Sequence, residues 1–188
     1  MPQIHKNQIR AVMKWKNAKM TMEKFDQYFN NVVALNESME ESLTYKELTD
    51  MKSADGVAPW LLKIKMPALT FMKNRASINA IYCIDDPANK KKIVMVSNQK
   101  MDPWFKEGKK HLGKDVVMSS TMDYTCCTEL PNGEGCLLEN VYDIGLAGSV
   151  PAWIIKMTAK TSLSNLELLG NYLTDNQMPG KYGKTQRL

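Results

Sequence analysis

The chain has 188 residues, of which 44% are hydrophobic and 24% charged, and its formal net charge is +5. This length and balance exclude fibrous and wholly disordered proteins, and they predict one soluble domain with a sizeable core. No apolar run is long enough for a transmembrane helix, and residues 1–10 lack the apolar stretch of a secretory signal. We therefore expect a cytoplasmic protein.

The residues that usually carry metal binding or catalysis are sparse and badly spaced for it. Cys126 and Cys127 are adjacent, and no CxxC pair occurs, so neither a zinc site nor a disulfide framework is predicted. His5 and His111 lie outside any metal-ligand spacing, and HExxH, GxSxG and P-loop patterns are absent from the sequence. We expect reduced thiols, no metal, no cofactor and no catalytic residues.

Charge is unevenly distributed, and the middle of the chain is the basic part. Residues 61–114 carry twelve basic and four acidic side chains, whereas residues 36–60 carry two basic and six acidic ones. Such a surface can meet nucleic acid, anionic lipid headgroups or an acidic partner, and an ordinary solvated face is an equally good explanation. Charge alone does not decide among these.

The first half of the chain begins with a strand and a helix. Ile9–Trp15 alternates apolar and basic residues, which predicts a half-buried strand, with Val12 as the exception. Thr21 is a candidate N-cap for an amphipathic helix that ends near residue 36. Further strands are predicted over residues 42–51 and 60–66.

A hairpin follows in the basic middle segment. Ile78–Ile84 alternates so that Tyr82 lies on its apolar face, Asp85–Asn89 supplies a turn, and Ile93–Val96 returns. Lysines 90, 91 and 92 lie at the tip of this hairpin. Residues 103–114 are polar and glycine-containing, which predicts a surface loop or a short helical turn.

The last part of the chain contains two more strands and a long helix. Residues 116–124 alternate with Met118, Met122 and Tyr124 on one face, and Asn132-Gly133 turns the chain into a strand over residues 136–144. Ser149 is a candidate N-cap, after which an apolar stripe predicts a helix to about residue 173.

This order of elements predicts an α+β fold. A long terminal helix with a wide apolar stripe needs an apolar surface to cover, and a curved antiparallel sheet wrapped around it provides one. The arrangement is a helix-grip fold, and where the sheet bends strongly enough a cavity lies between sheet and helix.

Two segments point to a known family. Residues 67–75 (PALTFMKNR) and 148–155 (GSVPAWII) resemble the central proline-to-arginine signature and the opening of the terminal helix in StAR-related lipid-transfer (START) domains. The resemblance implies a START-like lipid-binding domain over residues 1–174, short at its amino end relative to the family, and a flexible basic tail over residues 175–188.

The resemblance also implies a function. We expect a lipid-binding or lipid-transfer protein, without enzymatic activity, that encloses one hydrophobic ligand such as a sterol or phospholipid. In the family the arginine that matches Arg75 points into the cavity, where its guanidinium can hold a headgroup or a carboxylate. The candidate ligand-binding residues are Arg75, Tyr82, Met118, Met122, Tyr124, Trp153, Ile154 and Met157.

The expected partners follow from the same resemblance. The lipid is the ligand, the protein acts as a monomer, and nucleic acid is not a partner. Peripheral contact with an anionic membrane is expected through Lys90, Lys91, Lys92, Lys109 and Lys110.

Other functions remain open from the residues alone. Related helix-grip folds include cyclases and hydrolases, and a filled core would make the domain an interaction module. The apolar faces offer only Arg75, Tyr82 and Tyr124 as polar cavity groups for catalysis. Arg75 is equally an ordinary strand-edge residue in water, and core packing explains the many methionines as well as a ligand cavity does.

Overall fold

The computed structural model describes residues 3–5, 8–39, 42–52, 54, 58–66, 72–98 and 103–175. Its helices are α1 (Met22–Met39), α2 (Pro103–Leu112) and α3 (Ala152–Asp175). Its strands are β1 (Gln3–His5), β2 (Gln8–Asn17), β3 (Leu43–Glu47), β4 (Trp60–Ile64), β5 (Arg75–Asp86), β6 (Lys91–Asn98), β7 (Val116–Val117), β8 (Ser120–Glu129) and β9 (Cys136–Gly145).

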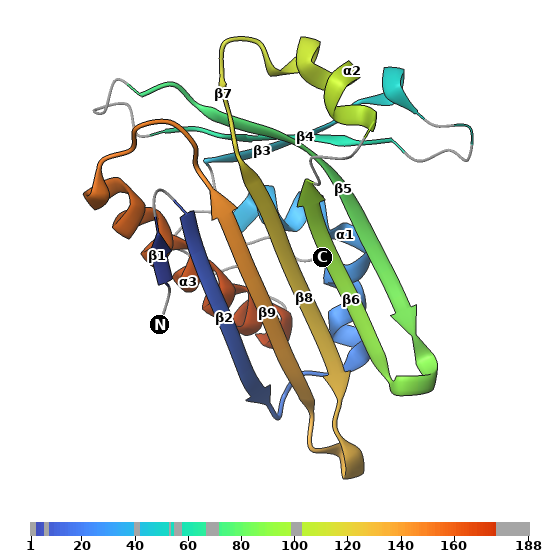
Figure 1. The fold of residues 1–188 in the computed structure, drawn as a ribbon. Helices are drawn as coiled ribbons and strands as arrows, with labels where there is room; N and C mark the ends of the chain where they lie inside the picture. Colours follow the sequence, from blue (N-terminus) through green and yellow to red (C-terminus); the bar gives the residue numbers. More distant parts are fainter. Residues whose placement is uncertain are drawn as a thin grey trace.

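The strands form one sheet in the order β1-β2-β9-β8-β6-β5-β4-β3, and β7 adds a short parallel pair with β5. β5 is the strand around which the sheet bends. Its first residues, Arg75–Asn79, pair with β4, and the following residues, Ala80–Asp86, pair with β6. As a result β4 and β3 cross over one end of the long strands (Figure 1).

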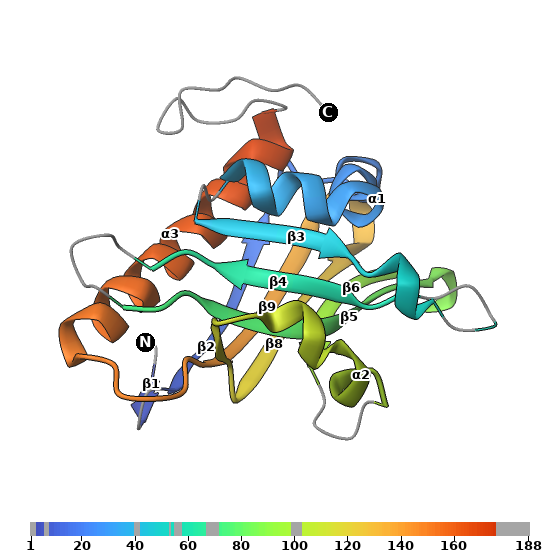
Figure 2. The same ribbon diagram turned by 90° about the horizontal axis from the view of Figure 1, so that it is seen from above.

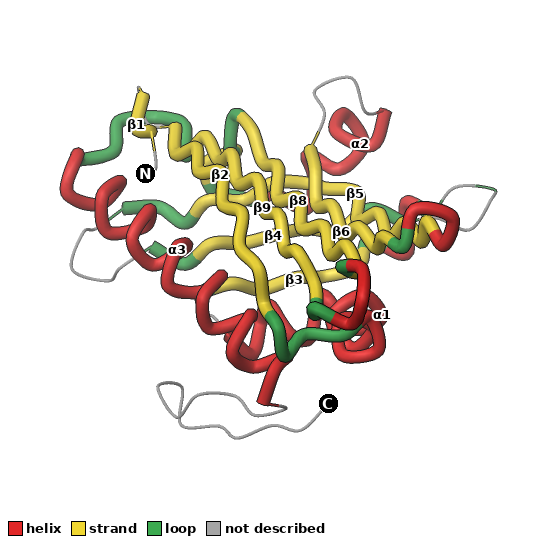
Figure 3. Tube along the Cα trace, turned by 90° about the horizontal axis from the view of Figure 1, so that it is seen from below, coloured by secondary structure: helices red, strands yellow, loops and turns green. Residues whose placement is uncertain are grey.

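The helices lie on both sides of this curved sheet. α1 and α3 pack on one side, which we call the inner face, where α1 also contacts β3, β6 and β8 and α3 contacts β2 (Figures 1 and 3). α2 lies on the opposite, outer face, against β5 (Figure 2). The α+β helix-grip arrangement is thus confirmed.

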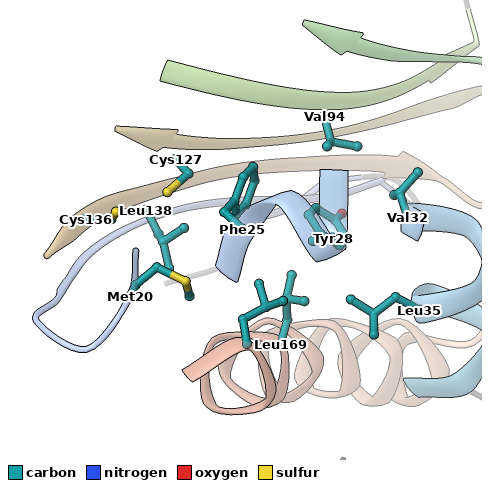
Figure 4. Close-up of a cluster of buried hydrophobic side chains, with 11 residues drawn as sticks. Met20, Phe25, Tyr28, Val32, Leu35, Val94, Cys127, Cys136, Leu138 and Leu169 are labelled. Carbon is teal, nitrogen blue, oxygen red and sulfur yellow. The ribbon is translucent and has the colours of Figure 1, made fainter. Parts of the chain in front are cut away.

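Two apolar clusters lie on the inner side, one at each end. The first, the α1 cluster, joins α1 to the sheet and to the end of α3 (Figure 4). Its buried members are Met20, Phe25, Tyr28, Val32, Leu35, Val94, Cys127, Cys136, Leu138, Leu169 and Leu173.

The second, the α3 cluster, joins the start of α3 to β2, β4 and β9. Its buried members are Ile9, Leu62, Ile64, Met66, Met118, Ile144, Leu146, Val150, Ile154, Ile155 and Ala159. α3 therefore spans the inner face with a buried contact at both ends, Ile154 at one and Leu173 at the other.

A β-bulge interrupts the alternation at the start of β8. Ser120 is the register partner of Gly145, and the amide of the preceding Ser119 also donates to the Gly145 carbonyl at 2.9 Å. Two residues on one strand thus oppose one on the other, which shifts side chains to the opposite face. Met118 points inward before the bulge, and Thr121 points inward after it.

Several predicted elements need correction. The predicted strand over residues 42–51 ends at Glu47 and is followed by a 3-10 turn at Thr49–Met51. The segment over residues 103–114, predicted as a surface loop or a short helical turn, is mostly the longer helix α2, which covers Ile78 with Gly108 and Leu112. The Thr21 N-cap agrees with the structure, since its hydroxyl accepts from the Lys24 amide at 3.2 Å.

Parts of the predicted pattern lie outside the described residues. These are residues 67–71, which carry most of the first motif, and residues 176–188 of the predicted tail. The domain boundary at residue 174 therefore stays a prediction.

Candidate functional site

A band of polar side chains crosses the inner face between the two apolar clusters. On β8 it lies between Met118 and Cys127, and on β9 it lies between Leu138 and Ile144. We call this set the polar belt. It consists of Ser77 and Asn79 on β5, Thr121, Asp123 and Thr125 on β8, and Asn140 and Tyr142 on β9, faced by Tyr28 and Asn36 from α1 and Tyr45 from β3.

Asp123 is the central charged group of the belt. The Asn140 amide donates to Asp123 Oδ1 at 2.9 Å and to Thr125 Oγ1 at 3.0 Å. Burial raises the pKa of Asp123 to about 6, and the hydrogen bond from Asn140 partly opposes this rise. The carboxyl group is therefore mostly ionised at neutral pH and takes up its proton near pH 6.

Tyrosines from three elements surround this carboxyl group. Tyr142 is the register partner of Asp123, and Tyr28 and Tyr45 approach it from α1 and β3. Burial, and then the Asp123 charge, raise the pKa of both Tyr28 and Tyr45, so these hydroxyls stay neutral.

Hydrogen bonds hold two of these tyrosines in place. The Tyr28 hydroxyl bonds Thr125 and Asn36, and Tyr45 shares Asn36 as a partner. The Tyr45 amide donates to Glu37 Oε1 at 2.6 Å, which ties β3 to the end of α1. The aromatic side of the belt is thus fixed relative to β8.

A second group of polar side chains continues the belt toward β5. Asn79 Nδ2 donates to Ser77 Oγ at 2.8 Å and to the Ser77 carbonyl at 3.3 Å. Thr121 Oγ1 bonds Ser77 Oγ at 3.2 Å, which links β5 to β8 across the inner face. All three residues are buried.

Two acceptors in the belt are left without partners. Asn79 Oδ1 and Asn140 Oδ1 are buried oxygens with no hydrogen bond from the described residues. An unsatisfied buried polar atom costs free energy, so such atoms are uncommon unless they serve another purpose.

Arg75 is buried, but its partners are backbone carbonyls. The guanidinium donates to the carbonyls of Leu146 at 3.0 Å, Lys73 at 2.5 Å and Ala147 at 3.4 Å. It is only 2% exposed, and burial lowers its pKa. The described part of the chain gives it no carboxylate, so Arg75 fixes the loop that leads from β9 into α3.

Two other predicted site residues lie beside that loop. Met118 and Ile154 are both buried in the α3 cluster, as is Leu146, whose carbonyl Arg75 binds. Arg75, Met118 and Ile154 therefore gather at the α3-cluster end of the inner face.

Three predicted site residues lie on the outer face. Tyr82, Met95 and Tyr124 are successive register partners on β5, β6 and β8, and Met122 shares the face of Tyr124. Tyr82 is 43% exposed. The expectation that Tyr82, Met122 and Tyr124 line the enclosed side is wrong.

The physical reasons for these errors differ between the strands. On β8 the bulge at Ser119–Ser120 reverses the alternation between Met118 and Met122. On β5 the apolar alternation belongs to the outer face, where α2 covers its first member, Ile78.

Trp153 and Met157 are also placed away from the polar belt. They are 57% and 41% exposed, whereas Ile154 between them is completely buried. The α3 face that carries Trp153 and Met157 therefore points away from the sheet.

Most of the predicted membrane-contact lysines pair with acids. Lys90 pairs with Glu129 at 3.3 Å, and Lys110 pairs with Asp50 at 2.9 Å. Lys92 turns to the inner face, where it pairs with Asp26 and lies 5.0 Å from the centre of the Phe29 ring. Its side chain is only 17% exposed, so Lys92 is not part of an exposed cluster.

Sequence reasoning missed Asp123 and its neighbours. Their strand was interpreted by its apolar alternation over residues 116–124, which put Thr121 and Asp123 on the face opposite Met118, Met122 and Tyr124. A run of polar residues at every second position, matched by Asn140 and Tyr142 on the paired strand, is the signal that could have found them.

The described part of the chain contains no helix long and apolar enough to cross a membrane. Within the same residues, no group of His, Cys, Asp and Glu side chains has a geometry that could hold a metal ion. The four cysteines are free thiols.

Comparisons with known proteins find this architecture among solved structures but not among known sequences. No family model and no curated protein sequence matches the chain. Human STARD10 superimposes with a TM-score of 0.58 at 12% identity over 90% of this chain, which spans 63% of the STARD10 chain.

Two further solved structures give similar values. The human StarD13 (DLC2) lipid transfer and protein localization domain has a TM-score of 0.57 at 12% identity, covering 88% of this chain and 76% of that one. Human StAR-related lipid transfer protein 5 has a TM-score of 0.58 at 12% identity, covering 89% of this chain and 75% of that one. The predicted START-like fold is confirmed as a fold.

Proposed function

We propose that this protein binds one hydrophobic molecule in a cavity between the inner face of the sheet and α3, and carries it through water. One observation carries the proposal. Asp123, Tyr45 and Tyr142 lie on the inner face, between sheet and helices, yet each is half-buried rather than buried. Partial exposure at enclosed positions is what side chains lining an internal space show.

The distribution of apolar and polar residues supports the same function. Two apolar clusters flank a narrow polar belt, as in small-molecule sites where hydrophobic walls surround a few polar groups. Enclosure matters because each exposed methylene costs about 0.8 kcal/mol in water. The lipid-transfer domain among the similar structures supports a lipid as the ligand.

Mass spectrometry of the purified protein tests the proposal. Spectra under native conditions and after organic extraction should show one hydrophobic molecule per chain. A protein that carries no such molecule, and binds none from a panel of sterols, phospholipids and fatty acids, would overturn the proposal.

A matched pair of variants locates the ligand. Met13 is the register partner of Asn140 and half-buried on the inner face, and Val12 beside it is 63% exposed on the outer face. We expect Met13→Trp to lose most of the bound ligand, because the indole fills the space next to the belt. Val12→Trp should keep it, provided circular dichroism shows both variants folded.

Ligand exchange at an anionic membrane completes the proposed transfer function. Lys90, Lys91, Lys109 and Lys110 are the lysines that fit this role. Lys90 and Lys110 stay 63% and 62% exposed beside their acidic partners, whereas Lys92 turns to the inner side and is 17% exposed. Attraction by such lysines weakens as salt is added.

A second candidate function is acid–base catalysis on the enclosed ligand, because Asp123 has a pKa of about 6. The same extraction distinguishes the two. A ligand recovered with unchanged mass after long incubation with the protein supports carriage, and a mass change that depends on Asp123 supports catalysis.

A further inference from the structure

The polar belt contains more hydrogen-bond acceptors than donors. The Asn140 amide uses its two hydrogens on Asp123 and Thr125, and the Asn79 amide uses both of its hydrogens on Ser77. Their oxygens, Asn79 Oδ1 and Asn140 Oδ1, have no donor among the described residues. Rotating Asn140 by half a turn would place its oxygen against the Asp123 carboxylate, so its orientation is fixed.

Asp123 adds a negative charge to this surplus of acceptors. Its hydrogen-bond partner in the described part of the chain is the neutral Asn140 amide. Two basic side chains that lie toward the inner face are engaged elsewhere. Arg75 donates to backbone carbonyls, and Lys92 pairs with Asp26 and Asp85. A half-buried carboxylate that lies between sheet and helices without a cationic partner is still costly, and a cation brought by a ligand would remove that cost.

The tyrosines around Asp123 suit a cation as well. Tyr28, Tyr45 and Tyr142 approach the carboxyl group from α1, β3 and β9. Aromatic ring faces attract ammonium groups, most strongly away from water.

We propose that the ligand is an amphiphile with a primary or secondary amine as its polar end, and that its ammonium group lies against Asp123 and donates to the orphaned amide oxygen of Asn140. This inference rests on the proposed enclosure of a hydrophobic molecule and specifies the chemistry of its polar end. The apolar remainder lies against the clusters on either side of the belt.

Three probes with the same eight-carbon chain test the inference. Octylamine, octanol and octanoate are titrated calorimetrically into delipidated protein at pH 7.5. We expect octylamine to bind at least tenfold more tightly than octanol, because only the amine carries a charge that complements Asp123, and octanoate to bind most weakly.

The pH dependence supplies an independent readout. The groups that face Asp123 are Tyr28 from α1, Tyr45 from β3, and Asn140 and Tyr142 from β9, and the two tyrosines with raised pKa values stay neutral across this range. Because the Asp123 carboxyl takes up its proton near pH 6, octylamine affinity should fall about tenfold between pH 7 and pH 5. Octanol affinity should stay constant.

Matched variants assign the effect to one carboxylate. Asp123→Asn should lose the preference for the amine and its pH dependence while still binding octanol. Asp143→Asn is the control. Asp143 is the register partner of Met122, so it lies on the outer face, where it accepts a hydrogen bond from Gln8 at 2.7 Å. This variant should behave as the parent protein.

The outcomes separate this inference from the function on which it rests. If octanol or octanoate binds as tightly as octylamine, or if Asp123→Asn keeps the amine preference, the inference is wrong and the enclosure of a hydrophobic ligand stands. If none of the three probes binds and no hydrophobic molecule co-purifies, the proposed function itself is wrong.

Discussion

At the scale of single residues, the ionised side chain of Asp123 lowers the free energy of unfolding. Burial raises its pKa from 3.8 to about 6, so the folded protein holds this proton to higher pH than the unfolded chain does. The contribution of this group to the free energy of unfolding is therefore most favourable below pH 4. That contribution is lost as the pH rises through 6. A fold with no use for a charge here would have little reason to keep it.

Asp123→Asn should for this reason stabilise the protein at neutral pH. The difference between 3.8 and about 6 corresponds to at most about 3 kcal/mol, since one pKa unit is worth about 1.4 kcal/mol. Urea unfolding at pH 7 should show a gain within that limit, and the gain should vanish near pH 3.5. A variant less stable than the parent at pH 7 would contradict the assigned pKa shift.

The residue scale is also where the sequence was least informative. Arg75 was identified as a candidate cavity residue, and it is buried, but its partners are the carbonyl of Lys73 and two carbonyls, Leu146 and Ala147, of a loop 71 and 72 residues away. Hydrogen bonds to backbone carbonyls leave no trace in side-chain patterns. The sequence could therefore indicate that Arg75 is unusual without indicating what it binds.

At the scale of elements, the bulge between β8 and β9 decides which side chains face the belt. Gly145 makes the bulge possible, because a Cβ atom there would lie 2.1 Å from Ser119 Oγ and 2.8 Å from Ser120 Oγ. These approaches are far inside van der Waals contact, so either the strand or the serines must move.

Gly145→Ala should consequently destabilise the protein by about 1–3 kcal/mol, the usual cost of overpacking. The double variant Gly145→Ala with Ser119→Ala should recover part of the loss, because it removes the nearest clashing atom. Chemical denaturation of both single variants and the double variant measures this coupling. Strictly additive effects would show that Ser119 is not the atom in conflict.

Most element types were predictable from periodicity, whereas the inward faces of β5 and β8 were not. The strands around residues 9–15 and 136–144 and the long terminal helix all form close to their predicted positions. The face of β8 was assigned wrongly because one extra residue in a strand inverts every position after it. The polar belt was hidden by that inversion.

At the scale of the whole molecule, α3 joins the two apolar clusters that lie on either side of the polar belt. Ile154 anchors its start, and Leu169 and Leu173 anchor its end. Lys24 Nζ also donates to the Thr174 carbonyl at 2.5 Å, which fixes the last turn to α1. The buried contacts of α3 described here therefore lie at its two ends.

Substitutions on α3 should reflect this arrangement. Leu173→Ala should cost about 2–5 kcal/mol, because the side chain is 1% exposed in the α1 cluster. Met157→Ala, on the outward side and 41% exposed, should change stability by less than about 0.5 kcal/mol. Equal effects in thermal denaturation would contradict the placement of these two faces.

The overall architecture was the most predictable level. The order of strands and helices, with the two short motifs, was enough to predict the helix-grip arrangement that the similar structures confirm. The order of elements limits the possible topologies severely. It says nothing about which side chains meet inside.

The pairing of β2 with β9 also governs how the chain can fold. Gln8 pairs with Gly145, so β2 cannot pair along its long edge until β9, the last strand in the described part of the chain, has been made. Contacts this distant in sequence slow folding, and an unpaired strand edge is open to intermolecular pairing meanwhile. During synthesis, the edge of β2 therefore stays open to pairing with other chains until β9 has emerged.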